Sequence, residues 1–374
     1  MSPFPRPEYG PLDRYAPDRR PVATDLSDNT SLRGPHPAAR MALREASDED
    51  LTRYPSVYAD AFREAAARHH GIPPESVVTG CGSDDLLDSA FRAVAAPGEG
   101  VAYLTPTFSM VEIFARMNAL EPTPVPRGAP GEPLPSPARL LEADPALVYL
   151  CSPNNPTGEV LPPEWVEELL DAGGPRGPVV LLDEAYADFA EGSLASRAPA
   201  TERLMVLRTL SKAYGLAGLR LGYALGSEEV VAEVEKSRGP YKVSRPAEAA
   251  AQAALDDDSG WVAQGVEEAR ESRRRLVEEL EERGFRPPTS GANFVLVPLD
   301  EGKDAARLTA ELRDEGVAVR PFPALPGVGE AVRVTVGPWS LMERFLEALD
   351  RTGASGPGLM GASGPEARDQ GDVR

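Results

Sequence analysis

Histidine is scarce in this chain of 374 residues, which contains only His36, His69 and His70. This scarcity argues against a histidine-rich metal site and against a catalytic triad, so acid–base chemistry has to come from other side chains. Cysteine is equally rare, because Cys81 and Cys151 are too few for a disulfide framework. The first ten residues have neither the basic nor the apolar region of a signal peptide, and we therefore expect a cytoplasmic protein.

Long apolar runs and excess positive charge are also missing. No stretch of about 18 apolar residues is present, so we expect no membrane-spanning helix. Against 59 Asp and Glu there are 39 Lys and Arg, which gives a net charge of −20. Nucleic acids and anionic membranes are disfavoured as partners by this charge. The length suggests two domains, and a hydrophobic fraction of 41% is enough to build their cores.

The chain is rich in proline, with 39 residues, and these fall in clusters. Residues 1–24 are so dense in proline that we expect an extended or disordered arm. A second cluster at 122–137 is interpreted as a surface connection. Residues 351–374 repeat Ala-Ser-Gly-Pro and carry few large apolar side chains, which predicts a flexible tail.

Between these clusters, strand and helix patterns alternate as in a sheet covered by helices. Short apolar runs typical of buried strands lie at 77–78, 100–104, 146–150, 179–182, 204–207 and 221–225. Helical spacing is found at 58–70, 84–96, 109–118, 163–172 and 261–283. The order then changes to strand 293–297, helix 306–315, strands 317–321 and 331–336, and helix 340–349. The sequence therefore predicts a larger α/β domain over 46–240 and a smaller α+β domain over 241–350.

Two segments carry charged groups at the ends of predicted strands. Asp183 and Glu184 follow the apolar run at 179–182, at the sheet edge where ligands of open α/β folds bind. A phosphate-loop nucleotidase is excluded, because the Gly-Lys pair at 302–303 is followed by aspartate. Lys212 lies among small, apolar and hydroxyl residues, where desolvation favours a neutral, nucleophilic amine. Alone, each segment also fits a strand that ends in solvated charges.

Two further segments favour ligand binding by loops. Residues 151–158, Cys-Ser-Pro-Asn-Asn-Pro-Thr-Gly, form a rigid turn that aims an amide side chain at a ligand. Residues 79–85 run from strand to helix, and Gly82 and Ser83 place free backbone N–H groups at the helix start, as in phosphate sites. Ser211 with Arg220 would provide a second phosphate contact. Either segment alone is also compatible with a plain turn.

Together, the segments Ser-Pro-Asn-Asn-Pro-Thr-Gly, Asp-Glu-Ala-Tyr and Ser-Lys-x-x-x-Leu-x-Gly-Leu-Arg-x-Gly resemble the fold-type I pyridoxal phosphate aminotransferases of class I/II. The histidinol-phosphate aminotransferase branch is the most similar. Matching segments at 53–55, 106–110, 291–294, 319–322 and 332–337 extend the resemblance from about residue 25 to 349. It implies a large cofactor-binding domain with a mainly parallel mixed sheet sandwiched by helices, a smaller α+β C-terminal domain, and a segment 25–45 that packs on the small domain and the active site.

The resemblance also implies roles for individual residues. Lys212 would form the Schiff base with the cofactor aldehyde and move the substrate proton, and Asp183 would pair with the ring nitrogen. Asn155 and Tyr186 would bind the ring's phenolic oxygen, while Phe108 stacks on the ring. The cofactor phosphate would lie among the remaining predicted contacts, which are Gly82, Ser83, Asp84, Ser211 and Arg220. The family's tyrosine at the position of Tyr54 reaches the cofactor across a subunit interface, so a homodimer is implied.

The resemblance is less informative about the substrate. Arg333 matches the family arginine that binds the carboxylate or phosphate of the substrate, and Arg320 matches a second arginine of the branch. Two forked cations suit a dianion, although Arg320 also fits a surface position at a strand end. The family's Asn-Glu-Asn-Pro loop reads Asn29-Thr30-Ser31-Leu32 here, with Asn29 predicted to contact substrate.

Three readings of the function remain. The first is an aminotransferase that acts on histidinol phosphate, or on another biosynthetic amino acid, with a 2-oxo acid such as 2-oxoglutarate. A decarboxylase for phosphorylated threonine is a second reading on the same fold. A non-catalytic pyridoxal-sensing module is the third, disfavoured because residues 1–24 are too short for a DNA-binding domain and the set of catalytic positions is complete.

Overall fold

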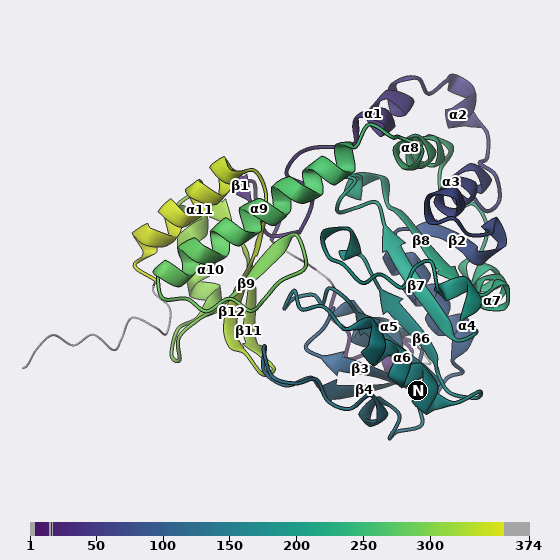
Figure 1. Cartoon of the computed structure of the whole chain (residues 1–374), viewed down its shortest axis with the longest axis horizontal. Helices are drawn as coiled ribbons and strands as arrows, with labels where there is room; N and C mark the ends of the chain where they lie inside the picture. Colours follow the sequence, from purple (N-terminus) through teal and green to yellow (C-terminus); the bar gives the residue numbers. More distant parts are fainter. Residues whose placement is uncertain (1–3, 15, 17, 355–374) are drawn as a thin grey trace, which may run out of the picture.

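The computed structural model of the chain describes residues 4–14, 16 and 18–354, which form two units that each contain a sheet and helices (Figure 1). The larger unit is built on a seven-stranded sheet of order β2-β8-β7-β6-β5-β3-β4. Its strands are β2 (Val77–Cys81), β3 (Gly100–Thr105), β4 (Glu121–Pro126), β5 (Leu147–Cys151), β6 (Val179–Asp183), β7 (Leu204–Thr209) and β8 (Leu221–Gly226). Strand β8 runs antiparallel to both of its neighbours, and the other pairs are parallel. The predicted α/β class with a mainly parallel mixed sheet is confirmed.

Apolar side chains hold this sheet between two layers of helices. Along β6, Val180 and Leu182 pack in one core cluster, whereas Val179 and Leu181 face the other. This alternation buries both faces of the strand, as expected for a parallel sheet. One layer contains α1 (Pro37–Arg44), α3 (Asp60–His70), α6 (Pro163–Gly173) and α8 (Arg245–Leu255), and the other contains α4 (Ser83–Val94), α5 (Met110–Met117) and α7 (Glu228–Arg238). Helix α2 (Asp48–Thr52) lies between α1 and α3 in the chain.

The smaller unit has a three-stranded antiparallel sheet of order β11-β12-β9. Its elements are α9 (Trp261–Glu282), β9 (Phe294–Pro298), α10 (Ala305–Asp314), β10 (Val317–Ala318), β11 (Arg320–Leu325), β12 (Gly329–Thr335) and α11 (Trp339–Thr352). Near its start the chain already joins this unit, because β1 (Thr24–Asp25) pairs in parallel with β10. Helix α9 extends from the small sheet toward the larger unit in Figure 1, and its residue Val266 packs beside Tyr186.

The remaining helical turns are short. They are the 3-10 helices η1 (Pro7–Tyr9), η2 (Pro74–Ser76), η3 (Pro137–Leu140), η4 (Ala187–Phe189), η5 (Ala198–Ala200) and η6 (Ala217–Leu219). None of the helices in the described residues is long and apolar enough to cross a membrane.

The structure corrects the interpretation of the proline cluster at 122–137. Its first residues form β4, the edge strand of the large sheet, rather than a surface connection. The backbone N–H groups of Glu121 and Arg127 donate to the carbonyls of Glu99, just before β3, and Thr105, at its end, at distances of 2.9 and 3.1 Å. Prolines at 122, 124 and 126 take the alternate positions, where an N–H would face the open edge, so they remove no hydrogen bond from the sheet.

Four other expectations differ in detail from the structure. The predicted strand at 317–321 is divided into β10 and β11, which pair with different partners. Helix α8 follows the boundary predicted at residue 240, yet its buried alanines pack in the core of the large sheet. In the arm, residues 7–9 form a helical turn rather than extended chain. The predicted tail begins inside α11, and residues 355–374 lie outside the described part of the chain.

Candidate active site

The functional residues converge where the parallel strands β5, β6 and β7 end. A cavity of about 670 Å³ lies at this edge of the sheet and is bounded on its other side by β11, β12 and the segment after β1. All but two of the residues predicted from the sequence line it: Asn29, Ser83, Asp84, Phe108, Asn155, Asp183, Tyr186, Ser211, Lys212, Arg220, Arg320 and Arg333. Their convergence follows from the parallel sheet, which brings the carboxyl ends of successive strands to one edge.

A buried carboxylate forms the floor of the cavity. Asp183 ends β6 and is 6% exposed. The Tyr149 hydroxyl donates to its Oδ2 at 2.8 Å, and the Ala185 N–H donates to its Oδ1 at 3.0 Å. Burial raises the pKa of Asp183 to about 6, because desolvation outweighs these two hydrogen bonds, which favour the ionised form. A cationic ring nitrogen at this position would supply the missing counter-charge.

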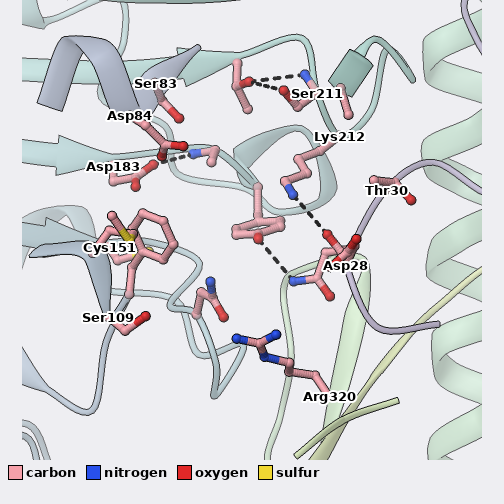
Figure 2. A pocket seen from close by; sticks show the side chains of 18 of the residues that line it. Asp28, Thr30, Ser83, Asp84, Ser109, Cys151, Asp183, Ser211, Lys212 and Arg320 are labelled. Atoms are coloured by element: carbon pink, nitrogen blue, oxygen red, sulfur yellow. Dashed lines mark hydrogen bonds between the residues drawn. The ribbon is translucent and has the colours of Figure 1, made fainter. Parts of the chain in front are cut away.

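One end of the cavity is shaped to hold an anion. Ser83 and Asp84 begin helix α4, and Figure 2 shows them on the same side as Ser211. The Ser211 N–H donates to Thr209 Oγ1 at 3.1 Å, and Arg220 Nη2 lies 3.4 Å from Asp84 Oδ2. Arg220 adopts a left-handed backbone conformation with φ of 53°. A guanidinium, a hydroxyl and the N–H groups of a helix start together form a typical phosphate site.

Glycines make this anion site possible. A Cβ atom at Gly222 would lie 2.4 Å from the carbonyl carbon of Gly82 and 2.5 Å from the nitrogen of Ser83. A Cβ atom at Gly82 would meet Arg220 Nη2 at 2.6 Å. Gly82 does not itself line the cavity, although it was predicted to contact the cofactor. Its place is behind the Arg220 guanidinium, where the lack of a side chain leaves room for that group.

The amine of Lys212 projects into the middle of the cavity. Its Nζ donates to the backbone carbonyl of Asp28 at 3.3 Å, as Figure 2 shows, and lies 5.4 Å from the centre of the Tyr186 ring. Asn155 is partly buried in the turn that follows β5 and lines the same cavity, and Phe108 lines the wall together with Met110. This arrangement places a primary amine, a phenol and an amide around one open volume.

The opposite end of the cavity is cationic. Arg320 on β11 and Arg333 on β12 are register partners on adjacent strands. Arg333 Nη2 donates to the Ser27 carbonyl at 2.9 Å, and its Nη1 contacts Asn155 Oδ1. In Figure 2 Arg320 lies across the cavity from Ser83 and Ser211. The site therefore has two anion-binding ends with the lysine between them.

Tyr54 is the second predicted residue that lies outside the cavity. Its side chain is 80% exposed and packs on the ring of Tyr241, with the ring centroids 5.0 Å apart. The described chain does not bring it to its own site, so its predicted contact across a subunit interface stays a prediction.

Sequence reasoning missed four residues of the site. Tyr149 was interpreted as a strand residue only. A phenol hydroxyl inside a buried strand needs a polar partner, and this requirement could have indicated its role. Cys151 lines the cavity at the end of β5, and burial raises the pKa of its thiol well above the usual range. Asp28 and Arg19 also line the cavity and form an ion pair, a contact that no sequence pattern indicates.

The donor set fits pyridoxal phosphate. The anion site, where glycines leave room for Arg220 and the start of α4, matches the cofactor's phosphate. The buried carboxylate of Asp183 matches its ring nitrogen, and the amine of Lys212 matches its aldehyde. The fold and the site thus define a fold-type I pyridoxal phosphate enzyme.

Comparisons with known proteins agree with this class. The family model "Aminotransferase class I and II" matches residues 22–349. The chain is 32% identical over 341 residues to histidinol-phosphate aminotransferase 1 of Trichormus variabilis, covering 90% of this chain and 95% of the relative. It is 35% identical to an aromatic amino acid aminotransferase of Mycobacteroides abscessus, covering 91% and 97% of the two chains.

Among solved structures, histidinol-phosphate aminotransferase from Sinorhizobium meliloti in complex with pyridoxal 5'-phosphate superposes with a TM-score of 0.82. The two sequences are 28% identical, and the match covers 94% of this chain and 97% of the other. The chain belongs to the class I and II aminotransferases and is a pyridoxal phosphate-dependent transaminase. The predicted family, enzyme class and cofactor are confirmed, whereas the roles of single residues stay predictions.

Proposed function

We propose that this enzyme transfers an amino group between an amino-alcohol phosphate of the histidinol-phosphate type and a 2-oxo acid such as 2-oxoglutarate. The observation that carries the proposal is the cationic end of the cavity. Arg320 and Arg333 face the same volume from adjacent strands, and Arg19 lines the mouth. Forked guanidinium groups bind a phosphate or a carboxylate in two places at once, which suits both partners of such a reaction.

The two arginines of the small sheet suit a substrate dianion. Arg320 and Arg333 are register partners on adjacent strands, and both line the cavity. Two guanidinium groups on neighbouring strands can each bind one side of a phosphate or a carboxylate.

In this proposal, each residue acts on the cofactor or the substrate from a fixed place. Lys212 holds the cofactor and moves the proton at the substrate α-carbon, because its amine projects into the open volume. When bound, pyridoxal phosphate supplies an aldehyde that bonds the amino group and a ring that takes up electrons released at the α-carbon. Asp183 would keep the ring nitrogen protonated, and Asn155 and Tyr186 would donate to the phenolic oxygen. Phe108 would pack on the ring, and the phosphate would be held by Ser83, Asp84, Ser211 and Arg220.

We also propose that two copies of the chain form the active enzyme. Tyr54, Val57 and Tyr241 are exposed aromatic and aliphatic side chains grouped on one surface, where the Tyr241 N–H donates to the Val57 carbonyl at 3.1 Å. In the dimer, Tyr54 of the partner subunit would reach the cofactor phosphate. The predictions of a cytoplasmic compartment and of a biosynthetic pathway stay predictions.

A half-reaction screen tests the substrate. Histidinol phosphate, phenylalanine and small amino acids are mixed in turn with the cofactor-loaded enzyme, and loss of the cofactor's absorbance band is followed in a stopped-flow instrument. We expect histidinol phosphate to react fastest. Equal or faster reaction with phenylalanine would contradict the proposal. The Lys212→Ala variant, which lacks the amine, should show no such band, and an unchanged band would refute the role of Lys212.

An aromatic amino acid is the second candidate substrate. It is favoured by the apolar wall, where Phe108, Met110 and Phe322 line the cavity, and by the similarity to an aromatic amino acid aminotransferase. The screen separates the two candidates directly. Phosphorylated threonine is assayed separately for carbon dioxide, and its release would instead favour the decarboxylase reading.

Mixing two defective variants tests the dimer. Lys212→Ala removes the amine and Tyr54→Ala removes the phenol, so each homodimer has two impaired sites. If Tyr54 acts across the interface, a mixed dimer has one site with both defects and one with neither. Activity should therefore reappear when the variants are unfolded and refolded together. If Tyr54 acted within its own chain, every site of the mixed dimer would keep one defect and no activity would return.

A further inference from the structure

Three consecutive residues after β1 each contact a different functional group of the site. The Ser27 carbonyl accepts from Arg333 at 2.9 Å, and the Asp28 carbonyl accepts from Lys212 at 3.3 Å. Asn29 uses its side chain instead, and its Nδ2 donates to the Tyr186 hydroxyl at 3.1 Å. Figure 2 shows the contact between Lys212 and Asp28 as a dashed line. Every residue has a backbone carbonyl, so the contacts of Ser27 and Asp28 do not depend on their side chains. The contact of Asn29 does depend on its side-chain amide.

The orientation of the Asn29 amide is fixed by Thr335. The Asn29 backbone N–H donates to Thr335 Oγ1 at 2.9 Å, so this hydroxyl oxygen already accepts a bond. Its single hydrogen then points to Asn29 Oδ1, which lies 3.2 Å away. With the amide oxygen as its acceptor, the buried hydroxyl is paired and the NH₂ group faces Tyr186, whereas the reverse orientation would take this acceptor away from the hydroxyl. Both Asn29 and Thr335 are 1% exposed, so bulk solvent does not compete for these groups.

The backbone of Asn29 is also held in a fixed conformation. Its φ of 55° lies in the left-handed region, which asparagine adopts more readily than most residues. Its carbonyl accepts from Asn293 Nδ2 at 3.1 Å. The Tyr186 ring is in turn packed edge-on against Phe294, with the ring centroids 5.0 Å apart. Neither partner of the amide–phenol bond is therefore free to turn away.

A phenol has one hydrogen to donate, and its oxygen here accepts from Asn29. The hydrogen must therefore point away from Asn29, and Tyr186 lines the cavity. We propose that Asn29 is a positioning residue that directs the Tyr186 hydroxyl hydrogen toward the cofactor's phenolic oxygen. This inference rests on the proposed place of the cofactor beside Tyr186. It gives Asn29 a different role from the substrate contact expected from the sequence.

The Asn29→Asp substitution reverses this bond with almost no change in shape. An ionised carboxylate only accepts, so the Tyr186 hydroxyl would donate to it and no longer to the cofactor. The cofactor's phenolic oxygen would then hold more negative charge and bind the proton that it shares with the lysine-linked nitrogen more strongly. We expect the midpoint pH of the cofactor's absorbance change to rise by about one unit, the equivalent of one hydrogen bond.

The measurement is a pH titration of the bound cofactor's absorbance, made in the natural and the Tyr186→Phe backgrounds. The new carboxylate also acts through its charge, and this part of the shift appears in both backgrounds. We expect the rise in the midpoint pH to be about one unit larger in the protein that keeps the Tyr186 hydroxyl than in Tyr186→Phe. Equal shifts in both backgrounds, or no shift, would overturn it. Ser31→Ala, in the same loop, is the matched control and should leave the midpoint unchanged.

A neutral variant covers the case in which Asn29→Asp fails to fold. Thr335→Val keeps the shape but removes the hydroxyl that fixes the amide, so the amide can turn its oxygen toward Tyr186. The midpoint should again rise, and only while the Tyr186 hydroxyl is present. A rise that persists in the Tyr186→Phe background would overturn the proposal. Absence of a lysine-linked absorbance band in the unsubstituted protein would instead refute the proposed cofactor site.

Discussion

Adding a single methyl group at Gly222 should weaken cofactor binding more than its size suggests. Gly222 lies on β8, opposite Gly80 of β2, and its missing side chain leaves room for the peptide bond between Gly82 and Ser83. In Gly222→Ala the Cβ atom would lie 2.4 Å from the Gly82 carbonyl carbon, whereas ordinary contact begins at 3.4 Å. The obstructing atoms belong to the backbone, so they cannot rotate away.

The loop that begins α4 has to move by about 1 Å to relieve this contact, since 3.4 − 2.4 is 1.0 Å. Overpacking of this kind costs about 1–3 kcal/mol, which corresponds to a rise of about five- to 150-fold in the Kd for pyridoxal phosphate if the strain falls on the phosphate site. The loop is where we expect the strain to fall, because Ser83 sits at the start of α4 and lines the cavity, whereas β8 is held by strands on both sides.

Gly218→Ala is the matched control. It adds the same methyl group on the other side of Arg220, where a Cβ atom would meet no heavy atom within 4 Å. Titration of the cofactor-free variants with pyridoxal phosphate, followed by absorbance, gives the two Kd values. The thermal unfolding of the cofactor-free proteins shows whether strain remains in the fold. If Gly222→Ala binds the cofactor as tightly as Gly218→Ala, the steric argument is wrong.

Three further predictions concern the charged groups of the site. The pKa of Asp183 is raised from 3.8 to about 6 in the fold, so the cofactor-free protein loses stability as the pH rises through this interval. Asp183→Asn has no carboxyl group to ionise, so its stability should not fall in this way. The difference in the free energy of unfolding between the two proteins should therefore grow by up to about 3 kcal/mol from pH 4 to pH 7, because a pKa change of about 2.2 units is worth about 1.36 kcal/mol per unit. A constant difference in urea denaturation would contradict it. Tyr149→Phe removes a hydrogen bond to the ionised carboxylate and should raise its pKa in the fold further, so the pH at which this difference stops growing should rise by about one unit, and a fall would refute the reasoning. Arg19→Ala should raise the KM for an anionic substrate about threefold with little change in kcat. The expected rise is small because the exposed Arg19 side chain is screened by water. Arg20→Ala is the control, and an equal effect there would show that Arg19 has no special role.

The motif residues at strand ends could be predicted from the sequence because their placement follows from a general rule. Asp183 comes directly after one apolar run and Asn155 lies in the turn after another, and parallel strands bring such residues to one edge whatever the rest of the chain does. The edge strand β4 was not predicted, because its many prolines suggested a loop. A local count of prolines does not reveal that every second N–H of an edge strand has no partner in the sheet, so that proline is tolerated there.

Other parts of the site depend on contacts between distant segments. Asn29 meets Tyr186 157 residues later in the chain, and it meets Thr335 306 residues later. The role of Asn29 depends on which atom of its amide faces which partner, and sequence spacing carries no information on this. Arg19 is likewise brought to the cavity mouth by neighbours on either side, because Arg313 contacts Asp18 and the carbonyl of Arg20. These contacts are products of tertiary packing.

The pairing of the chain's beginning with its end determines when the site is completed during synthesis. Asn29 leaves the ribosome early, yet its partner Thr335 is made 306 residues later. At about 5–20 residues per second this interval lasts about 15–60 s. Strands β2 to β8 are all made before it ends, so the large sheet can fold around Lys212 and Asp183 first. A nascent chain interrupted before β12 therefore carries the lysine and the carboxylate but lacks the contacts that fix Asn29, and the active site is among the last parts of the molecule to form.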